Sequence, residues 1–228
     1  MSMTLSSCFL ILTVAAAADL TPLEPAIQQA QPKLEIRWVN AASSVLSQQI
    51  ENGAPYDVFL SANAQFVDRL ASNGKLRPDS VRAYATGRVA VLWSDHKSHP
   101  VSDLTQSWVR FVALPNPKLA PYGAAAQQAL EHAGLWAGVK GKVVYGENVR
   151  QTLELFNSGN ADAVLTALSL IQERKPDLIP ADWHAPIVQK AGVVASSKDE
   201  QSARSFLEFL TSPAGQAIFA KFGFGPAR

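Results

Sequence analysis

The chain has 228 residues, 47% of them hydrophobic, which suffices for one large domain or for two lobes of about 100 residues each. Twenty basic and nineteen acidic residues give a formal net charge of +1, so no overall field attracts nucleic acid, an acidic membrane surface or a cationic substrate. The single cysteine, Cys8, excludes an intramolecular disulfide and any multi-cysteine zinc or iron–sulfur site. Any ligand must therefore be recognised by a local arrangement.

The N-terminal stretch MSMTLSSCFLILTVAAAA allows two interpretations. As an export signal it has an apolar run and small residues at 15–18 that suit a signal peptidase, but it lacks a basic start. As part of the fold, residues 9–16 form a first buried strand. We favour the strand because the following residues then read as strand, turn and helix, and we expect the export signal to lie upstream or to be incomplete here.

Apolar stretches of strand length alternate with amphipathic stretches of helix length, which is the pattern of an α/β protein with largely parallel sheets. The expected strands are residues 9–16, 34–39, 56–61, 88–93, 109–114, 142–145, 163–167 and 187–195. The expected helices are residues 21–31, a helix capped by Ser43 or Ser44 and ended by Gly53, 64–73, 124–133, 150–158, and a pair within 201–222 split at Ser212 and Pro213. The strand at 88–93 starts a second sheet, and the C-terminal helices are expected to return to the first lobe.

Motifs for catalysis are missing from the sequence. It contains no Gly-x-Ser-x-Gly elbow, no phosphate-binding glycine loop ending in Lys-Ser or Lys-Thr, and no His-Glu-x-x-His. His96 and His99 are spaced like a metal-binding pair, but their polar turn offers no cysteine or third histidine, so we interpret both as surface residues. The five tryptophans are scattered without basic neighbours, which gives no stacking platform for nucleic acid.

One local design recurs along the chain: a buried strand, a turn of small or hydroxyl residues, and a helix start. It occurs at AAAADL, NAASSVL and GENVR. A helix start presents unpaired backbone N–H groups and the positive end of a dipole, so several converging starts form an anion site without lysine or arginine. Each turn alone is ordinary, because Asp, Ser and Asn cap helices for stability.

Five stretches resemble, in this order, blocks of the periplasmic molybdate-binding proteins of ABC importers: VAAAADL, SSVLSQQIENGAPYDVFLSA, LPNPKLAPYGAAAQQAL, VYGENVRQTLELFNSGNADA and ARSFLEFLTSPAGQAIFAKFGF. Two shorter strings within them, IENGAPYDVFLSA and FLTSPAGQAIF, are shared with type II binding proteins in general, whereas APYG followed by GENVR is more specific. The resemblance covers nearly the whole chain and implies an α/β, two-lobe type II periplasmic-binding-protein fold with a hinge between two βα sheets. Lobe one is then expected at 1–84 plus 195–228 and lobe two at 85–194, with crossings near 84–87 and 193–197.

The resemblance also implies the ligand, because that family binds molybdate or tungstate between its lobes through backbone N–H groups and a few hydroxyls, without a salt bridge. Carried over by position, the contacts fall on Ala18, Asp19, Ser43, Tyr122 and Val149. Ser43 can donate its hydroxyl and its N–H, Tyr122 a phenol, and Val149 only its N–H. Neither a metal cation site nor a cofactor is expected, apart from the molybdenum within the anion.

Asp19 is the unusual member of this set, since many members of that family have serine there. A carboxylate about 5 Å from a dianion would cost on the order of 6 kcal/mol at an effective dielectric constant of about 20. We therefore expect the Asp19 side chain to turn away, cap its own helix and lend only its N–H. A tyrosine found in some members is replaced by Ala167, so Tyr122 would supply the phenol, and Arg150 is expected to face solvent.

The function implied is that of a periplasmic, monomeric, non-catalytic binding protein that presents its closed form to the membrane subunits of an ABC importer. Three alternatives remain: a receptor for sulfate, phosphate or an organic anion, an enzyme on the same fold, and the sensor lobe of a transcription regulator. The regulator would need a helix-turn-helix segment, which the chain lacks.

Overall fold

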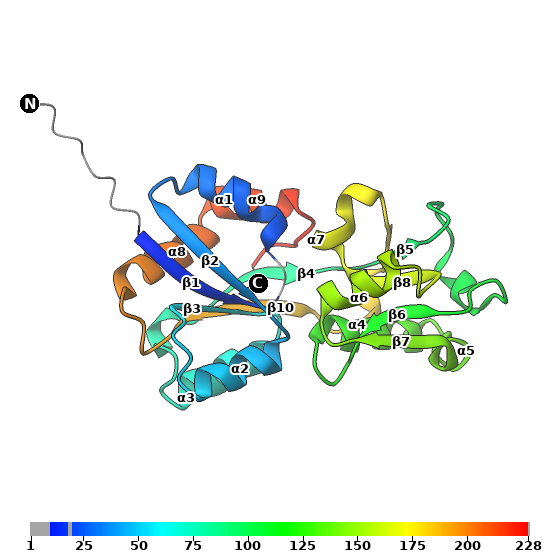
Figure 1. Ribbon diagram of the computed structural model, residues 1–228, viewed down its shortest axis with the longest axis horizontal. Helices are drawn as coiled ribbons and strands as arrows, with labels where there is room; N and C mark the ends of the chain where they lie inside the picture. Colours follow the sequence, from blue (N-terminus) through cyan, green and yellow to red (C-terminus); the bar gives the residue numbers. More distant parts are fainter. Residues whose placement is uncertain (1–9, 18–19, 228) are drawn as a thin grey trace, which may run out of the picture.

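A computed structural model describes residues 10–17 and 20–227 of the chain, which form two lobes joined side by side (Figure 1). Each lobe is built on a five-stranded sheet, in the order β2-β1-β3-β10-β4 in the first lobe and β7-β6-β8-β5-β9 in the second. The strands are β1 Leu10–Ala16, β2 Leu34–Asn40, β3 Val58–Ser61, β4 Arg82–Gly87, β5 Val89–Trp93, β6 Val112–Pro115, β7 Val143–Gly146, β8 Ala163–Ala167, β9 Asp177–Leu178 and β10 Ile187–Val193. The helices are α1 Glu24–Ala30, α2 Ser43–Glu51, α3 Ala64–Ser72, α4 Pro121–His132, α5 Trp136–Val139, α6 Val149–Asn157, α7 Leu168–Ile171, α8 Glu200–Thr211 and α9 Pro213–Lys221.

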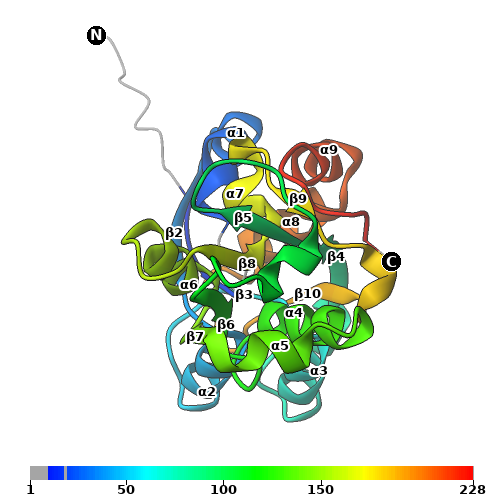
Figure 2. The same cartoon turned by 90° about the vertical axis from the view of Figure 1, so that its right-hand side faces the viewer.

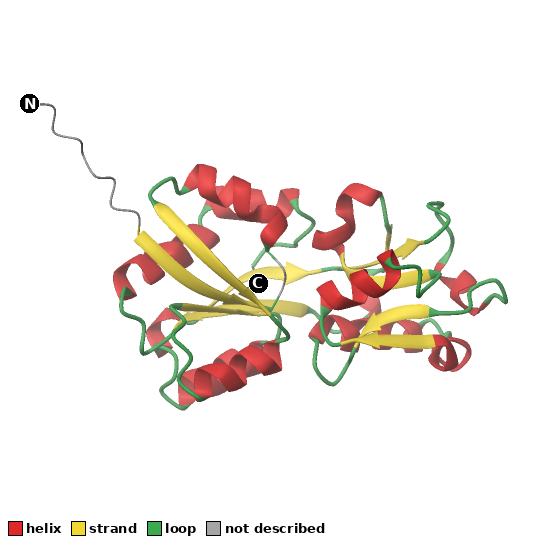
Figure 3. Ribbon diagram, in the orientation of Figure 1, coloured by secondary structure: helices red, strands yellow, loops and turns green. Residues whose placement is uncertain are grey.

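The sheet of the first lobe is covered by helices on both faces (Figure 3). Strand β1 pairs in parallel with β2 and β3, and its side chains alternate between two cores. Leu12 and Val14 face the core that contains Phe206 of α8, whereas Ala15 faces the core that contains Leu46 of α2. The prediction of a strand at 9–16 is confirmed for Leu10–Ala16, and Phe9 lies outside the described residues.

The sheet of the second lobe is built in the same way, with β6 parallel to both β7 and β8 and with β5 antiparallel to β8. Figure 2 looks onto this lobe and shows α4 and α7 on opposite sides of its sheet. Ala126 of α4 packs with Val91 of β5, whereas Ile171 of α7 packs with the neighbouring Ala90. Alternation along the strand therefore buries both faces.

The strands that join the lobes differ from the sequence prediction. Strand β4 was not predicted, and β10 pairs antiparallel with β3 and β4, so residues 85–87 and 187–193 belong to the first sheet although the sequence assigned them to lobe two. The crossings lie at Arg88, between β4 and β5, and ahead of Ile187 rather than at 193–197. The apolar pattern of residues 187–195 indicates a strand but carries no information about which sheet it joins.

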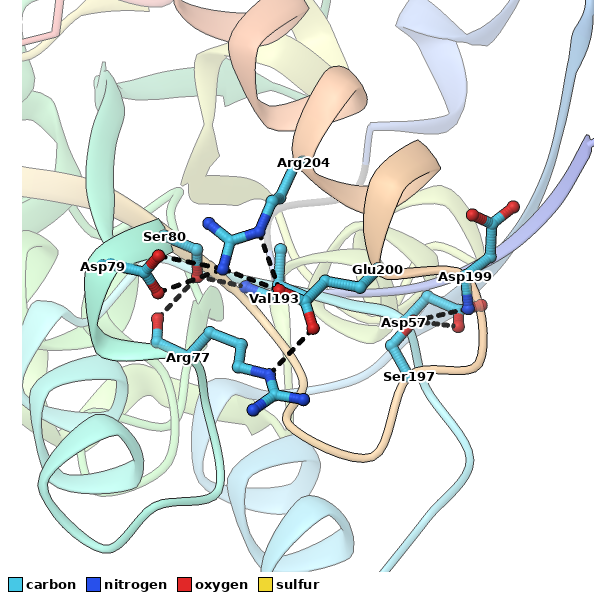
Figure 4. A network of polar contacts seen from close by, with 9 residues as sticks. All are labelled: Asp57, Arg77, Asp79, Ser80, Val193, Ser197, Asp199, Glu200 and Arg204. Atoms are coloured by element: carbon cyan, nitrogen blue, oxygen red, sulfur yellow. Dashed lines mark hydrogen bonds and ion pairs between the residues drawn. The ribbon is translucent and has the colours of Figure 1, made fainter.

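Helices α8 and α9 return to the first lobe, as predicted. A polar network at the start of α8 fixes this return (Figure 4). Glu200 pairs with Arg77 and Arg204, and the Arg204 guanidinium, hydrogen-bonded to Asp79, lowers the pKa of that carboxyl below its usual value of 3.8. No helix in the described part of the chain is both long and apolar enough to cross a bilayer.

Candidate functional site

The start of α2 presents free donors towards the second lobe. The N-cap residue is Ala42, which has no side chain able to cap, and the first backbone bond of the helix runs from Leu46 N to Ala42 O. The N–H groups of Ser43, Ser44 and Val45 therefore precede the helical hydrogen-bond pattern. The expectation that Ser43 or Ser44 caps the helix is wrong, because Ser43 is already its first residue.

The Ser43 hydroxyl is the most unusual group in this part of the molecule. Its side chain is completely buried, and its Oγ has no hydrogen-bond partner among the described residues. A buried hydroxyl without a partner costs about 1–3 kcal/mol, so such a group calls for an explanation. A ligand that accepts a hydrogen bond at this helix start would provide one.

The start of α4 adds a donor from the second lobe. The helix begins at Pro121, three residues earlier than the sequence predicted, which places Tyr122 in its first turn. Pro121 has no N–H, and the N–H groups of Gly123 and Ala124 both donate to Ala120 O, at 3.0 and 3.3 Å. In the first turn of α4, the N–H of Tyr122 is therefore the donor that does not bond to Ala120 O. The side chain of Ala120 cannot cap the helix either.

The start of α6 adds a further donor from the second lobe. Asn148 caps this helix by accepting from Gln151 N at 2.9 Å, and its carbonyl accepts from Thr152 N at 3.0 Å. Val149 is the first residue of the helix, so its N–H takes part in neither of these bonds. The Val149 side chain is buried. A residue with an inert side chain can therefore act as a ligand through its backbone.

Two polar contacts between the lobes involve these helix starts. The Ser44 hydroxyl contacts Leu119 O at 3.4 Å, which joins the start of α2 to the loop that leads into α4. Arg150 Nη2 donates to Thr21 Oγ1 at 3.1 Å, which joins the start of α6 to the turn after β1. Arg150 is exposed, as predicted, but its guanidinium also contacts the other lobe through Thr21.

The remaining predicted site residues, Ala18 and Asp19, lie outside the described residues. They belong to the turn between Ala17 and Leu20, which follows β1 and precedes Thr21. In Figure 1 the ends of β1 and β2 that precede this turn and α2 face the second lobe. Ligands of α/β proteins bind at such carboxyl ends of strands.

The electrostatics of these helix starts suit an anion. The donors from α2, α4 and α6 are neutral N–H groups and one hydroxyl, and each helix start contributes roughly half a positive charge through its dipole. Burial raises the pKa of the Tyr122 phenol, which therefore stays protonated and adds no negative charge. The arrangement can hold an anion by hydrogen bonds without a bound counter-charge.

Two hollows lie between the lobes. One, of about 480 Å³, is lined by Asn63 and Phe66 of the first lobe and by Leu119 and Gln128 of the second. Another, of about 350 Å³, is lined by Thr21 and by residues of α6. Ser43, Tyr122 and Val149 are buried and line neither hollow.

Sequence reasoning missed Thr21, Ser44 and Gln189, which all make polar contacts between the lobes. Gln189 left a signal, because the other inward positions of its strand, Ile187, Ala191 and Val193, are all apolar. His99 is held between the carboxylates of Asp95 and Asp103, at 3.0 and 3.4 Å.

Comparison with known proteins supports this description of the molecule. Residues 12–225 match the family model described as bacterial extracellular solute-binding protein. The chain belongs to this family. The members of this family bind solutes and are not enzymes. The predicted two-lobe fold of periplasmic binding proteins is confirmed.

Curated solute-binding relatives include a putative ABC transporter substrate-binding lipoprotein, YvgL, of Bacillus subtilis, 31% identical over 93% of this chain and 85% of the relative. The molybdate-binding protein ModA of Azotobacter vinelandii is 33% identical over 78% of this chain and 73% of its own. A solved periplasmic molybdate-binding protein of the same organism superposes with a TM-score of 0.84 at 32% identity, covering 94% of this chain and 98% of that one.

Proposed function

We propose that this protein is the substrate-binding component of an ABC importer and that it binds molybdate or tungstate between its lobes. Relatives from three further bacteria, Rhodobacter capsulatus, Haemophilus influenzae and Escherichia coli, are also named molybdate-binding proteins, at 32%, 30% and 27% identity. The proposal includes a periplasmic location, a monomeric state and delivery of the anion to the importer's membrane subunits, without catalysis.

The observation that carries the proposal is the buried Ser43 hydroxyl, which has no partner among the described residues and lies at an uncapped helix start that contacts the loop leading into α4. In the proposed complex a tetrahedral dianion accepts from Ser43 Oγ and from the N–H groups of Ser43, Tyr122 and Val149. The N–H groups of Ala18 and Asp19 would complete the set from the first turn. No side chain of this set contributes a formal positive charge, so selection depends on hydrogen-bond direction and cavity size.

The energetics are sufficient for tight binding. A hydrogen bond to a charged group contributes roughly 1.5–3 kcal/mol, so five to seven of them offset the costs of dehydrating the anion and closing the lobes. Sulfate offers the same acceptors on a smaller tetrahedron. Discrimination between the two anions would therefore come from the size of the closed cavity.

The test is isothermal titration of the purified protein with molybdate, tungstate, sulfate and phosphate. We expect one-to-one binding of molybdate or tungstate and weaker or no binding of the other anions. Ser43→Ala should weaken binding about ten- to a hundredfold through loss of one charge-assisted bond. Ser72→Ala is the matched control, since its hydroxyl is exposed and bonded to Arg69 O within its own helix.

Thermal unfolding separates a binding role of Ser43 from a structural one. Because the hydroxyl has no partner in the described structure, Ser43→Ala should leave the Tm of the ligand-free protein unchanged or slightly higher. A fall in Tm with unchanged affinity would show that Ser43 serves the fold. Tight binding of sulfate or phosphate in preference to molybdate would instead identify a receptor for another oxyanion.

A further inference from the structure

A chain of three buried polar side chains lies where the strands leave the first lobe. The Tyr84 hydroxyl of β4 donates to Gln189 Oε1 of β10 at 3.2 Å, and Gln189 Nε2 contacts the phenolic oxygen of Tyr122 of α4 at 3.3 Å. All three residues are at most 1% exposed. Since Tyr122 belongs to the second lobe and the other two to the first sheet, the contact between Gln189 and Tyr122 joins the lobes.

The backbone around this chain is shaped to accommodate it. The pairing of β10 with β4 goes from Gln189 opposite Ala85 to Lys190 opposite Ala83, so Tyr84 is an extra residue in the ladder. Such bulges redirect side chains and are built features of a sheet. At Gly87 a Cβ would lie 2.5 Å from the Tyr122 phenolic oxygen and 2.9 Å from Gln189 Nε2, so only glycine leaves room for this contact.

Tyr122 therefore has two separate polar ends. Its phenolic oxygen lies against the crossing strands, next to Gly87 and Gln189. Its backbone N–H belongs to the open first turn of α4, next to the loop that meets the start of α2. Burial raises the pKa of both Tyr84 and Tyr122, so both phenols remain neutral and can act as hydrogen-bonding groups at physiological pH.

We propose that Gln189 is a positioning residue that holds Tyr122 in the closed arrangement of the lobes, and that the phenol of Tyr122 serves this junction while its backbone N–H serves the anion. This inference rests on the proposed function. The first turn of α4 is then fixed from the strand side by Gln189 and from the cleft side by the ligand. In this inference, opening the lobes separates Gln189 from Tyr122, so the contact slows release of the anion.

The experiment is stopped-flow measurement of molybdate association and dissociation by tryptophan fluorescence, with Gln189→Met, Tyr122→Phe and the double variant. We expect each single change to speed dissociation about three- to tenfold, the effect of losing one neutral hydrogen bond, with little change in association. The double variant should dissociate no faster than the single ones, because both changes remove the same contact. Gln48→Met is the matched control, an exposed amide on α2 whose only described contact is Asn52 at 3.5 Å.

Gly87→Ala is an independent test that leaves both polar partners in place. Its methyl group should push the phenol from the strand side and speed dissociation by a similar factor. Faster dissociation with Tyr122→Phe but not with Gln189→Met, or effects that multiply in the double variant, would overturn the inference and make the phenol a direct ligand. If the unmodified protein binds none of the four anions, the proposed function fails and this inference fails with it.

Discussion

Gly123 is the position at which a single methyl group should disturb the site without touching the ligand. It lies in the first turn of α4, packed against the end of β6. A Cβ at Gly123 would be 2.0 Å from Pro115 O and 2.7 Å from Pro115 C, whereas real contacts of this kind essentially never fall below 3.0 Å. In Gly123→Ala the start of α4 must therefore move by about 1 Å.

That displacement would carry the N–H of Tyr122 from a hydrogen-bond distance of about 2.9 Å to about 3.9 Å, where no hydrogen bond remains. The loss of one bond to a charged acceptor is about 1.5–3 kcal/mol, so we expect affinity for molybdate to fall about ten- to a hundredfold. Isothermal titration measures this change, and circular dichroism with thermal unfolding checks that the variant is folded.

The control for Gly123→Ala is Gly141→Ala in the same lobe, where a Cβ meets nothing within 4 Å. This variant should bind like the unmodified protein. Full affinity in a folded Gly123→Ala variant would refute the reasoning, because it would mean that the first turn of α4 does not contact the anion.

Three further predictions concern the framework of the site. Leu46→Ala should lower the free energy of unfolding by about 2–5 kcal/mol in urea denaturation, since Leu46 is completely buried between α2 and the first sheet. Asn148→Ala removes the cap that accepts from Gln151 N and should cost about 1 kcal/mol in the same assay. Arg204→Gln should lower Tm at neutral pH. Arg204 depresses the pKa of Asp79, so the stabilisation is fully present above the unfolded pKa of about 4, is lost as pH falls through the depressed pKa, and should be absent well below it. Equal Tm differences at pH 7 and at about pH 2 would contradict this assignment.

The main elements were predictable because their signals are local. Short apolar runs identified β1 and β8, and the break at Ser212 and Pro213 separated α8 from α9, where Ser212 accepts from Gly215 N. The prediction failed where the signal was weak or non-local. Strand β4 mixes Arg82, Ala83 and Thr86 with buried residues, so its period is obscured, and the Pro121 turn concealed the true start of α4.

For the candidate site, too, some features were predictable from the sequence and others were not. The positions Ser43, Tyr122 and Val149 came from the sequence through its resemblance to the periplasmic molybdate-binding proteins, which the strings SSVL, APYG and GENVR carry. The sequence also named the donor atoms of these residues, and the structure then showed the surroundings of the Ser43 hydroxyl and of the Tyr122 phenol. Ser43 does not cap its helix, and the Tyr122 phenol lies at the crossing strands.

By itself the sequence therefore determined the α/β alternation, the approximate positions of the main helices and the family to which the chain belongs, all of which depend on neighbouring residues and recurring strings. Only the tertiary structure decided that β10 joins the first sheet, that the Ser43 hydroxyl is buried without a partner among the described residues, and that Gln189 meets Tyr122 across the lobes. The physical reason is that strand pairing, burial and contacts between lobes depend on residues far apart in the chain. Gln189 and Tyr122 are separated by 67 positions, and only the folded arrangement brings them together.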